Sequence, residues 1–164
     1  MSEPEILRGV RAVVFDMDGV ILESTYIKTE AFLELFADYP AQRVAILEYH
    51  LSHLGISRYD KFAWIYRELL NKPFPESERA RLGERFFELA MEKVLACPFV
   101  PGAVELLNEL YGKKRLFVAS GTPQEELDVM LERRGIGKNF EGAWGAPSKK
   151  PDTIRYVMKE YALT

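Results

Sequence analysis

The sequence predicts an α/β fold, in which a Rossmann-like core with a parallel sheet is interrupted by a set of inserted helices. Short apolar runs alternate with helical patterns at the front of the chain and again from about residue 98, which is typical of parallel βαβ units. Residues 25–96 show helical periodicity and almost no strand signal. With 164 residues, 48% of them hydrophobic, the chain suits one domain with a modest insertion and a sizeable core.

We therefore expect the core to consist of residues 1–23 and 98–164, and the helical insert of residues 24–97. The first core strand is Ala12–Phe15, a short apolar run of the kind that is buried on both faces of a sheet. The later core elements continue the alternation of strand and helix. They are a helix over 104–110, a strand over 115–119, a helix over 123–134, a strand over 140–144 and a helix over 152–162.

In the insert, apolar residues recur at helical spacing. Ala31, Phe32, Leu35 and Phe36 share one face, and a second stripe follows the i, i+3, i+4, i+7 pattern. That stripe comprises Phe62, Ile65, Tyr66, Leu69 and Leu70. Ser57 is predicted to begin the helix that carries this stripe, and a long helix is predicted over 77–96.

Composition and charge exclude several classes of function. The net charge of −3 comes from interleaved acids and bases, so we expect no nucleic-acid partner. The single cysteine, Cys97, excludes an internal disulfide and favours a reducing compartment. The N-terminus lacks a signal-peptide pattern, and no segment reaches the roughly 20 apolar residues of a membrane span. We expect a cytoplasmic protein with no membrane partner.

Two carboxylates, Asp16 and Asp18, directly follow the first predicted strand and precede Gly19. Acids at the end of a buried parallel strand lie where a ligand approaches the sheet, and a carboxylate held there can act as a nucleophile. A calcium loop would need glycine and glutamate where the chain has Ile21 and Ile27, so that interpretation is excluded. A plain turn after the strand remains the alternative.

Ser120 and Gly121 follow the second predicted strand at the entrance to a helix. Donors in this position suit a bound anion, and a phosphate-binding role for Ser120 is favoured over a purely structural one. Thr122 is predicted mainly to cap the helix, with Pro123 as its first residue and Glu125 completing a capping box.

His50 and His53 lie three residues apart on a predicted helix of the insert. They could share a metal ion, but no third ligand lies nearby in the sequence. An ordinary surface or partly buried role is therefore favoured.

The segment Asp16-Met-Asp-Gly-Val-Ile-Leu-Glu-Ser24 resembles the first motif of the phosphatase branch of the haloacid dehalogenase superfamily, which includes phosphoglycolate phosphatase-like and β-phosphoglucomutase-like proteins. The resemblance implies that Asp16 attacks phosphorus to form an aspartyl-phosphate and that Asp18 acts as general acid and base. It also implies Mg²⁺, bound by the Asp16 carboxylate and the Asp18 backbone carbonyl. Glu23 departs from the aspartate that is usual at its position.

The resemblance extends to two further motifs and to the insert. Ser120 and Gly121 would bind the phosphate, and Lys150 or Lys149 would balance its charge. Lys150 fits the motif spacing better. The helical insert would form a cap over the site, in which Arg58 and Lys61 contact the substrate. A solvated basic turn is an equally good interpretation of those two residues.

The resemblance does not extend to the acidic fourth motif of the superfamily, because no Gly-Asp string follows Lys150, nor to the C-terminal strands of the fold. Two interpretations remain: the given sequence is a fragment of a longer polypeptide, or the first strand lies on an open edge that another chain covers by self-association. We also expect weaker Mg²⁺ binding, because a carboxylate ligand is lost.

The function expected from these features is Mg²⁺-dependent hydrolysis of a small phosphate monoester, a sugar phosphate or phosphoglycolate, through an aspartyl-phosphate. The partner is then a small phosphorylated metabolite. Two alternatives are a phosphomutase of the same superfamily, which returns the phosphate to a sugar, and a catalytically silent, truncated binding protein.

Overall fold

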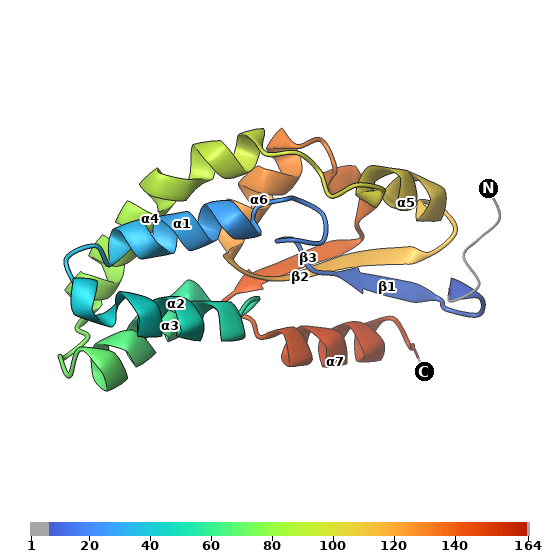
Figure 1. Ribbon diagram of the computed structural model, residues 1–164. Helices are drawn as coiled ribbons and strands as arrows, with labels where there is room; N and C mark the ends of the chain where they lie inside the picture. The colour runs from blue at the N-terminus through green and yellow to red at the C-terminus, as the bar shows by residue number, and fades with distance from the viewer. Residues whose placement is uncertain (1–6, 164) are drawn as a thin grey trace. The chain divides into compact units, whose positions relative to one another are not determined.

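The computed structural model describes residues 7–163 (Figure 1). The chain forms two compact units: one comprises the residues up to Leu22 and those from Pro98 onward, and the other is Glu23–Cys97. The first unit contains a parallel sheet flanked by helices, and the second is helical. The predicted α/β class is therefore confirmed.

The sheet of the first unit has three parallel strands in the order β1 (Ala12–Phe15), β2 (Arg115–Pro123) and β3 (Gly142–Ala146). Helices α5 (Ala103–Leu110) and α6 (Gln124–Arg133) lie on one side of it, and α7 (Lys150–Glu160) lies on the other (Figure 1). The middle of the central strand is buried, with Leu116, Phe117 and Val118 at most 1% exposed. Because all three strands run in the same direction, their carboxyl ends meet at one edge of the sheet.

Several predicted boundaries of core elements are wrong. The second strand continues past Ala119 to Pro123, through an irregularity after which Pro123 pairs with Ala146. The third strand begins at Gly142 instead of residue 140, because the Phe140 N–H closes a 3₁₀ turn, η4 (Gly137–Asn139), by donating to the Gly137 carbonyl. Helix α7 begins two residues earlier than predicted, at Lys150.

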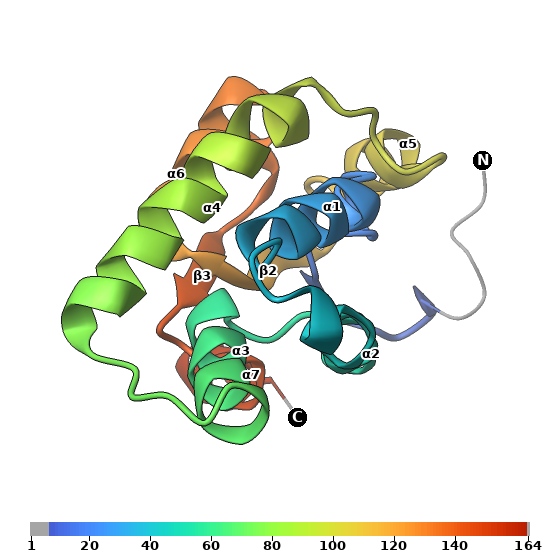
Figure 2. The ribbon, with the colours of Figure 1, turned by 60° about the vertical axis from the view of Figure 1, so that its left-hand side comes forward.

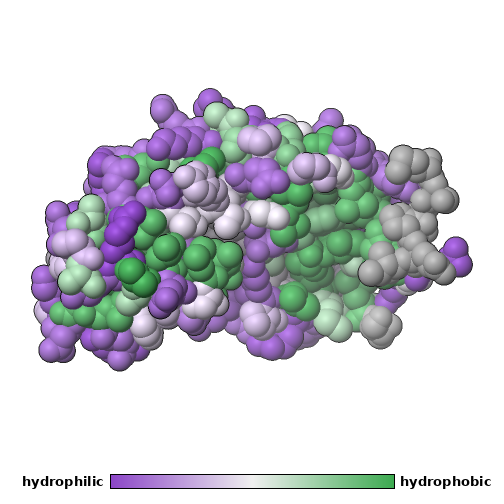
Figure 3. All heavy atoms as spheres, viewed as in Figure 1, coloured by the Kyte–Doolittle hydropathy of each residue, from purple (hydrophilic) through white to green (hydrophobic). Residues whose placement is uncertain are grey.

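Within residues 7–163, strand β1 pairs only with β2, so its other side is an edge of the sheet. An open groove runs along this edge and is largely apolar. Its lining includes Val10, Ala12, Val14, Ile154, Val157 and Met158. Figure 3 shows hydrophobic residues gathered over the β1 side of the sheet. The expected open edge is thus present in the described part of the chain.

The insert is built from four α-helices and shorter turns: α1 (Thr25–Leu35), η2 (Pro40–Gln42), α2 (Arg43–Ser52), α3 (Arg58–Trp64), the π-helical turn η3 (Ile65–Leu69) and α4 (Glu76–Ala96). Helices α1 and α4 lie side by side (Figure 2). Phe32, Phe62 and Phe86 form the aromatic centre, with ring centroids 5.5–6.4 Å apart. No helix among the described residues has both the length and the apolar character needed to cross a membrane.

The stripe predicted for the second half of the insert is only partly buried. Ile65 and Tyr66 are covered, whereas Leu69 and Leu70 are half-buried. The reason is the π-helical turn, whose wider winding carries the end of the stripe away from the face that Phe62 defines. Ser57 begins α3 as predicted, and its hydroxyl accepts a hydrogen bond from the Tyr59 N–H at 3.3 Å.

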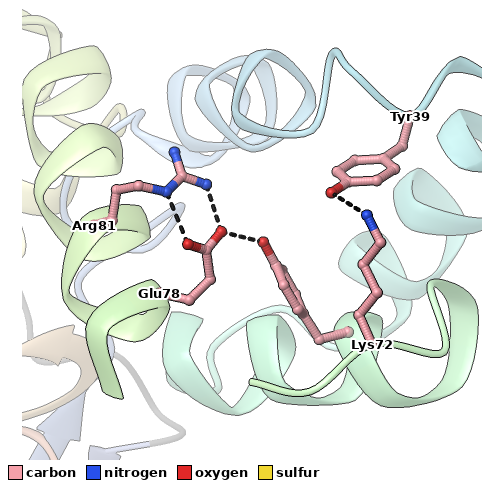
Figure 4. Close-up of polar contacts among 5 residues, drawn as sticks. Tyr39, Lys72, Glu78 and Arg81 are labelled. Atoms are coloured by element: carbon pink, nitrogen blue, oxygen red, sulfur yellow. Dashed lines mark hydrogen bonds and ion pairs between the residues drawn. The ribbon is translucent and has the colours of Figure 1, made fainter. Parts of the chain in front are cut away.

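The π-helical turn is tied to α4 by a polar cluster (Figure 4). The Tyr66 hydroxyl donates to Glu78, and the Arg81 guanidinium donates to both oxygens of the same carboxylate, at 2.6 and 3.0 Å. The hydrogen bonds from Arg81, followed by that from Tyr66, lower the pKa of Glu78 from 4.5 to about 2. The ionised carboxylate therefore belongs to the folded state of the insert.

Acid should weaken the insert through Glu78. Because the pKa of its carboxyl is lower in the folded state, the stabilisation is complete above pH 4.5 and is lost as the pH falls towards 2. We expect the free energy of unfolding of Glu78→Gln to lose the pH dependence that falls in this window. At neutral pH the variant should be about 1 kcal/mol less stable, since the ion pair between Glu78 and Arg81 is partly exposed. Urea unfolding followed by circular dichroism between pH 2 and 7 measures both. Glu76→Gln is the control because its carboxylate is 80% exposed, and an equal effect there would contradict the prediction.

Candidate active site

Asp16 and Asp18 lie on either side of the buried Met17, at the carboxyl end of β1. Met17 between them is fully buried, and its carbonyl accepts hydrogen bonds from the Ile21 and Leu22 N–H groups, each at 3.0 Å. Gly19 then turns the chain with φ of +73°, a conformation that favours glycine. The anchored Met17 and the tight turn explain why the two acids alternate with a buried residue and end at a glycine.

The Asp16 carboxylate is held from two sides. Its Oδ1 accepts from the Met17 N–H at 2.8 Å, and its Oδ2 accepts from the Lys150 ammonium at 2.6 Å. Both side chains of this ion pair are about one-third exposed or less. Lys150 is the first residue of α7, whereas Lys149 before it is exposed. Of the two candidate lysines, the structure therefore brings Lys150 to Asp16.

The tip of β2 reaches the second acid. Thr122 donates from its Oγ1 to the Asp18 Oδ2 at 3.2 Å, and its N–H donates to the Ser120 Oγ at 3.1 Å. Ser120 and Thr122 are buried, and Gly121 between them is half-buried. Residues from the ends of β1 and β2 and from the start of α7 thus meet at the carboxyl edge of the sheet.

The predicted capping role of Thr122 is wrong. Helix α6 begins at Gln124, so Pro123 is the residue before the helix, and no side chain caps it. Thr122 lies in β2 instead, where its hydroxyl bonds to a carboxylate. Such a charge-assisted hydrogen bond is stronger than a cap to a backbone amide.

Gln124 links elements beside the site, a role that its sequence pattern does not indicate. Its Oε1 accepts from the Gly145 N–H at 2.7 Å, and its Nε2 donates to the Ala143 carbonyl at 3.2 Å. These bonds join the start of α6 to β3, next to the residues that carry the polar side chains. Glutamine is common at helix starts, so no sequence signal distinguishes this one.

In the insert, Arg58 and Lys61 are buried, with exposed fractions of 6% and 4%. The guanidinium lies 4.3 Å from the centre of the Phe86 ring, and the Lys61 ammonium lies 5.7 Å from that of Phe32. The alternative of a solvated basic turn is therefore wrong. These cations are packed against the aromatic centre of the insert.

His50 and His53 do not share a site. The ring of His50 is buried and contacts Thr29 and Lys61, whereas His53 is exposed and bonds to Ser52 and to the Tyr49 carbonyl. Burial, followed by the positive charge of Lys61, lowers the pKa of His50 from 6.5 to about 4. Among residues 7–163, no group of three or more His, Cys, Asp or Glu residues is placed to hold a metal ion.

Asp16 and Asp18 nevertheless fit a magnesium ion. Mg²⁺ is usually bound by one or two carboxylates, with waters and substrate phosphates completing its six oxygen ligands. The two acids follow one strand within a single turn, next to a lysine and two hydroxyls that suit a phosphate. This donor set is compatible with the ion and leaves positions for a phosphate.

Asp16, Asp18 and Lys150 lie at the carboxyl edge of a parallel α/β sheet, where such folds bind their ligands. Residues 10–163 match the haloacid dehalogenase-like hydrolase family. The chain belongs to this family, so the resemblance of the first motif and the prediction of a hydrolase are confirmed.

Similar proteins agree with this assignment. A phosphorylated carbohydrates phosphatase from Thermotoga maritima is 28% identical over 157 residues, which cover 91% of this chain and 68% of that protein. A crystal structure described as a predicted phosphoglycolate phosphatase from Haemophilus somnus superposes with a TM-score of 0.68 at 18% identity, covering 93% of this chain and 72% of the other. CbbY from Rhodobacter sphaeroides, solved in complex with phosphate, gives 0.65 at 24% identity, with coverage of 93% and 72%. The structural likeness supports the fold.

Proposed function

We propose that this protein is a Mg²⁺-dependent phosphatase that hydrolyses small phosphate monoesters through an aspartyl-phosphate on Asp16. The observation that carries the proposal is the polar cluster at the carboxyl edge of the sheet, in which Lys150 contacts Asp16 and Thr122 contacts Asp18. The name of the Thermotoga maritima relative supports phosphorylated carbohydrates as the substrate class. Phosphoglycolate-type substrates are the other class that we propose.

In the first step, an Asp16 carboxylate oxygen attacks the phosphorus atom in line with the ester oxygen. The P–O bond to the alcohol breaks, and Asp18 donates a proton to the leaving oxygen. In the second step, Asp18 takes a proton from water, the resulting hydroxide attacks the aspartyl-phosphate, and the Asp16 carboxylate is restored. The sum is one ester and one water converted to one alcohol and one inorganic phosphate.

The other residues orient the reacting groups and neutralise their charge. The Lys150 ammonium lies where it would balance the charge of Asp16 and of the phosphoryl group, and Thr122 orients the Asp18 carboxylate. Ser120 accepts a hydrogen bond from the Thr122 N–H, so its hydroxyl proton can be donated to a phosphate oxygen, next to the Gly121 amide. Mg²⁺, when held by the Asp16 carboxylate and the Asp18 carbonyl, would offset the negative charge of the phosphoryl group.

We further propose that the helical insert acts as a cap that selects substrates. Arg58 and Lys61 then contact the organic part of a small phosphorylated metabolite. The support for this role is the burial of two cations on α3, Arg58 at its first residue and Lys61 in its last turn. Both cations are packed against aromatic rings of the insert, so a solvated surface role does not explain them.

Release of inorganic phosphate tests the proposed function. The purified chain is treated with EDTA, and MgCl₂ is then added in the presence of p-nitrophenyl phosphate, a hexose phosphate or 2-phosphoglycolate. We expect phosphate release that requires the metal. Isomerised hexose phosphate without free phosphate would indicate a phosphomutase instead, and binding without turnover of any ester would indicate a catalytically silent protein.

Replacing Lys150 should lower turnover strongly. Lys150→Met removes the ammonium 2.6 Å from the Asp16 carboxylate, and the loss of one such charge contact in a phosphoryl-transfer site should reduce kcat/KM on the order of 10²-fold. Lys149→Met is the matched control, because the neighbouring side chain is exposed. Similar losses in the two variants would show that Lys150 has no special place in the reaction. The measurement is Mg²⁺-dependent hydrolysis of p-nitrophenyl phosphate.

A further inference from the structure

A cavity lies at the amino edge of the sheet, at the opposite end of the strands from the candidate active site. It has a volume of about 730 Å³, and its lining comes from the segments that lead into the three strands: 9–11, 111–116 and 138–141. From Arg115 to Thr122 the central strand spans roughly 20 Å, at about 3.3 Å per residue. The cavity therefore belongs to the first unit but is separate from the residues that meet at the carboxyl edge.

The lining of this cavity is strongly basic, although the chain as a whole carries a net charge of −3. Its charged side chains are five cations and one carboxylate: Arg11, Lys113, Lys114, Arg115, Lys138 and Glu141. Charges of one sign that line a recess focus the electric field there and attract ions of the opposite sign. The cavity is therefore suited to an anion.

Part of this positive charge already has a partner within the first unit. Lys114 donates to two backbone carbonyls at 3.2 and 2.6 Å, and Arg115 forms an ion pair with Glu141 at 2.9 Å. The ammonium groups of Lys113 and Lys138, by contrast, form no hydrogen bond or ion pair in the described part of the chain. Both of these side chains are exposed, so they are available to a ligand in the cavity.

Asn139 provides an independent observation. This residue of η4 lines the cavity and is only 8% exposed. Its backbone N–H donates to the Ile136 carbonyl at 3.0 Å, whereas its side-chain amide forms no hydrogen bond within residues 7–163. Polar side chains that are buried to this extent normally have a hydrogen-bond partner. An unpartnered amide in the wall of a basic cavity therefore indicates a ligand that can bond with it.

We propose that this cavity is a second binding site, which takes a small molecule that carries a chain of phosphate groups. Its volume is typical of sites for small molecules, and lysine ammonium groups are common ligands of phosphate. Exposed ion pairs are weak individually, so a ligand whose charges contact both Lys113 and Lys138 is favoured over a single phosphate. The Asn139 amide can donate to a phosphate oxygen. Because the site lies away from Asp16 and Asp18, its occupancy does not depend on phosphatase activity.

The first test locates binding on the chain. Inorganic tripolyphosphate is added to the ¹⁵N-labelled protein in EDTA at low ionic strength, and ¹H–¹⁵N spectra follow two groups of the cavity, the Asn139 side-chain NH₂ and the Gly112 amide. We expect saturable shifts of both signals, with a Kd of about 1 mM or lower. The Gly121 amide reports on the candidate active site. Shifts confined to Gly121, or no saturable shift in the cavity up to about 10 mM, would overturn the proposal.

Further compounds distinguish the source of the phosphate chain. ATP is compared with inorganic tripolyphosphate in the same experiment. Tighter binding of ATP would assign the site to a nucleotide, and equal or weaker binding would assign it to a polyphosphate without a base. Orthophosphate that binds the cavity as tightly as tripolyphosphate would contradict the proposed ligand class.

The second test removes the groups that carry the proposal. Replacing both lysines, by Lys113→Gln and Lys138→Gln, should raise the Kd of tripolyphosphate about fivefold or more. Asn139→Asp keeps the shape of the side chain but places a negative charge in the wall, and it should weaken binding at least as much. Lys159→Gln is the matched control, because Lys159 is an exposed lysine of the first unit that does not line the cavity.

An equal effect of Lys159→Gln and of the double lysine variant would show that tripolyphosphate responds to overall charge, and this would overturn the proposal. If Asn139→Asp does not fold, the lysine variants and the Gly112 signal still decide the question. None of the replaced residues belongs to the proposed active site. A chain that hydrolyses no ester would therefore contradict the proposed function and leave this test unaffected.

Discussion

Asp16→Asn should abolish Mg²⁺-dependent phosphate release, with a fall in kcat of about 10³-fold or more, as expected when the nucleophile of a covalent mechanism is removed. The amide nitrogen and oxygen occupy nearly the same volume as the carboxylate, so packing around Met17 is preserved. The amide carries no charge, however, and cannot form the acyl phosphate. It also removes the ion-pair partner of Lys150, 2.6 Å away.

The measurement is hydrolysis of p-nitrophenyl phosphate with and without MgCl₂, together with mass spectrometry of the protein quenched during turnover. The parent chain should carry a phosphoryl group on Asp16, and the variant should not. Asp152→Asn is the control, because this aspartate is exposed on α7 and its side chain pairs with Arg155, one turn further along the same helix. Retained turnover in Asp16→Asn would show that Asp16 is not the nucleophile. Asp16 and Asp18 would then have a structural role, as in a plain turn after the strand.

Gly145→Ala should destabilise the first unit by about 3 kcal/mol, the upper end of the usual cost of overpacking. A Cβ at this position would lie 2.4 Å from the Thr122 carbonyl oxygen and 2.8 Å from the Gln124 backbone nitrogen. Both are main-chain atoms at the junction of β2 and α6, and they cannot rotate away as a side chain would. Moving Gly145 would also break the hydrogen bond from its N–H to Gln124.

Thermal unfolding measures this effect, and for a chain of this size about 3 kcal/mol corresponds to a fall in Tm of roughly 6–12 °C. We expect phosphatase activity to fall as well, because Thr122 contacts Asp18. Gly137→Ala is the matched control: a Cβ there makes only ordinary contacts at 3.7 Å with Leu131. A Gly145→Ala variant as stable as Gly137→Ala would show that β3 can shift away from β2 without cost.

The parts of the fold that could be predicted are those in which one local pattern decides the structure. Strand β1 is such a case, because an apolar run ending in Asp-x-Asp-Gly combines burial, turn chemistry and charge within a few residues. The helices of the insert are another, since Phe32, Phe36 and Phe62 recur at helical spacing and form its aromatic centre.

The features that could not be predicted depend on partners distant in the sequence. Thr122 has the local pattern of a helix cap, but the hydroxyl bonds to a carboxylate 104 residues away. The choice between Lys149 and Lys150 depends on the residue at which α7 begins, because the first helical position determines which side chain reaches Asp16. Likewise, the burial of Arg58 and Lys61 follows from the positions of Phe86 and Phe32 on other helices.

Lys150 occupies the first turn of α7, whereas the later turns of this helix are packed against the sheet. Val157, in the second half of α7, is 1% exposed, and the helix packs against β2. The opening turn of a helix frays more readily than its packed middle. Gentle warming would therefore disconnect the ammonium from Asp16 while the strands remain paired, so inactivation precedes melting, and strengthening this one turn would extend the temperature range over which the protein works.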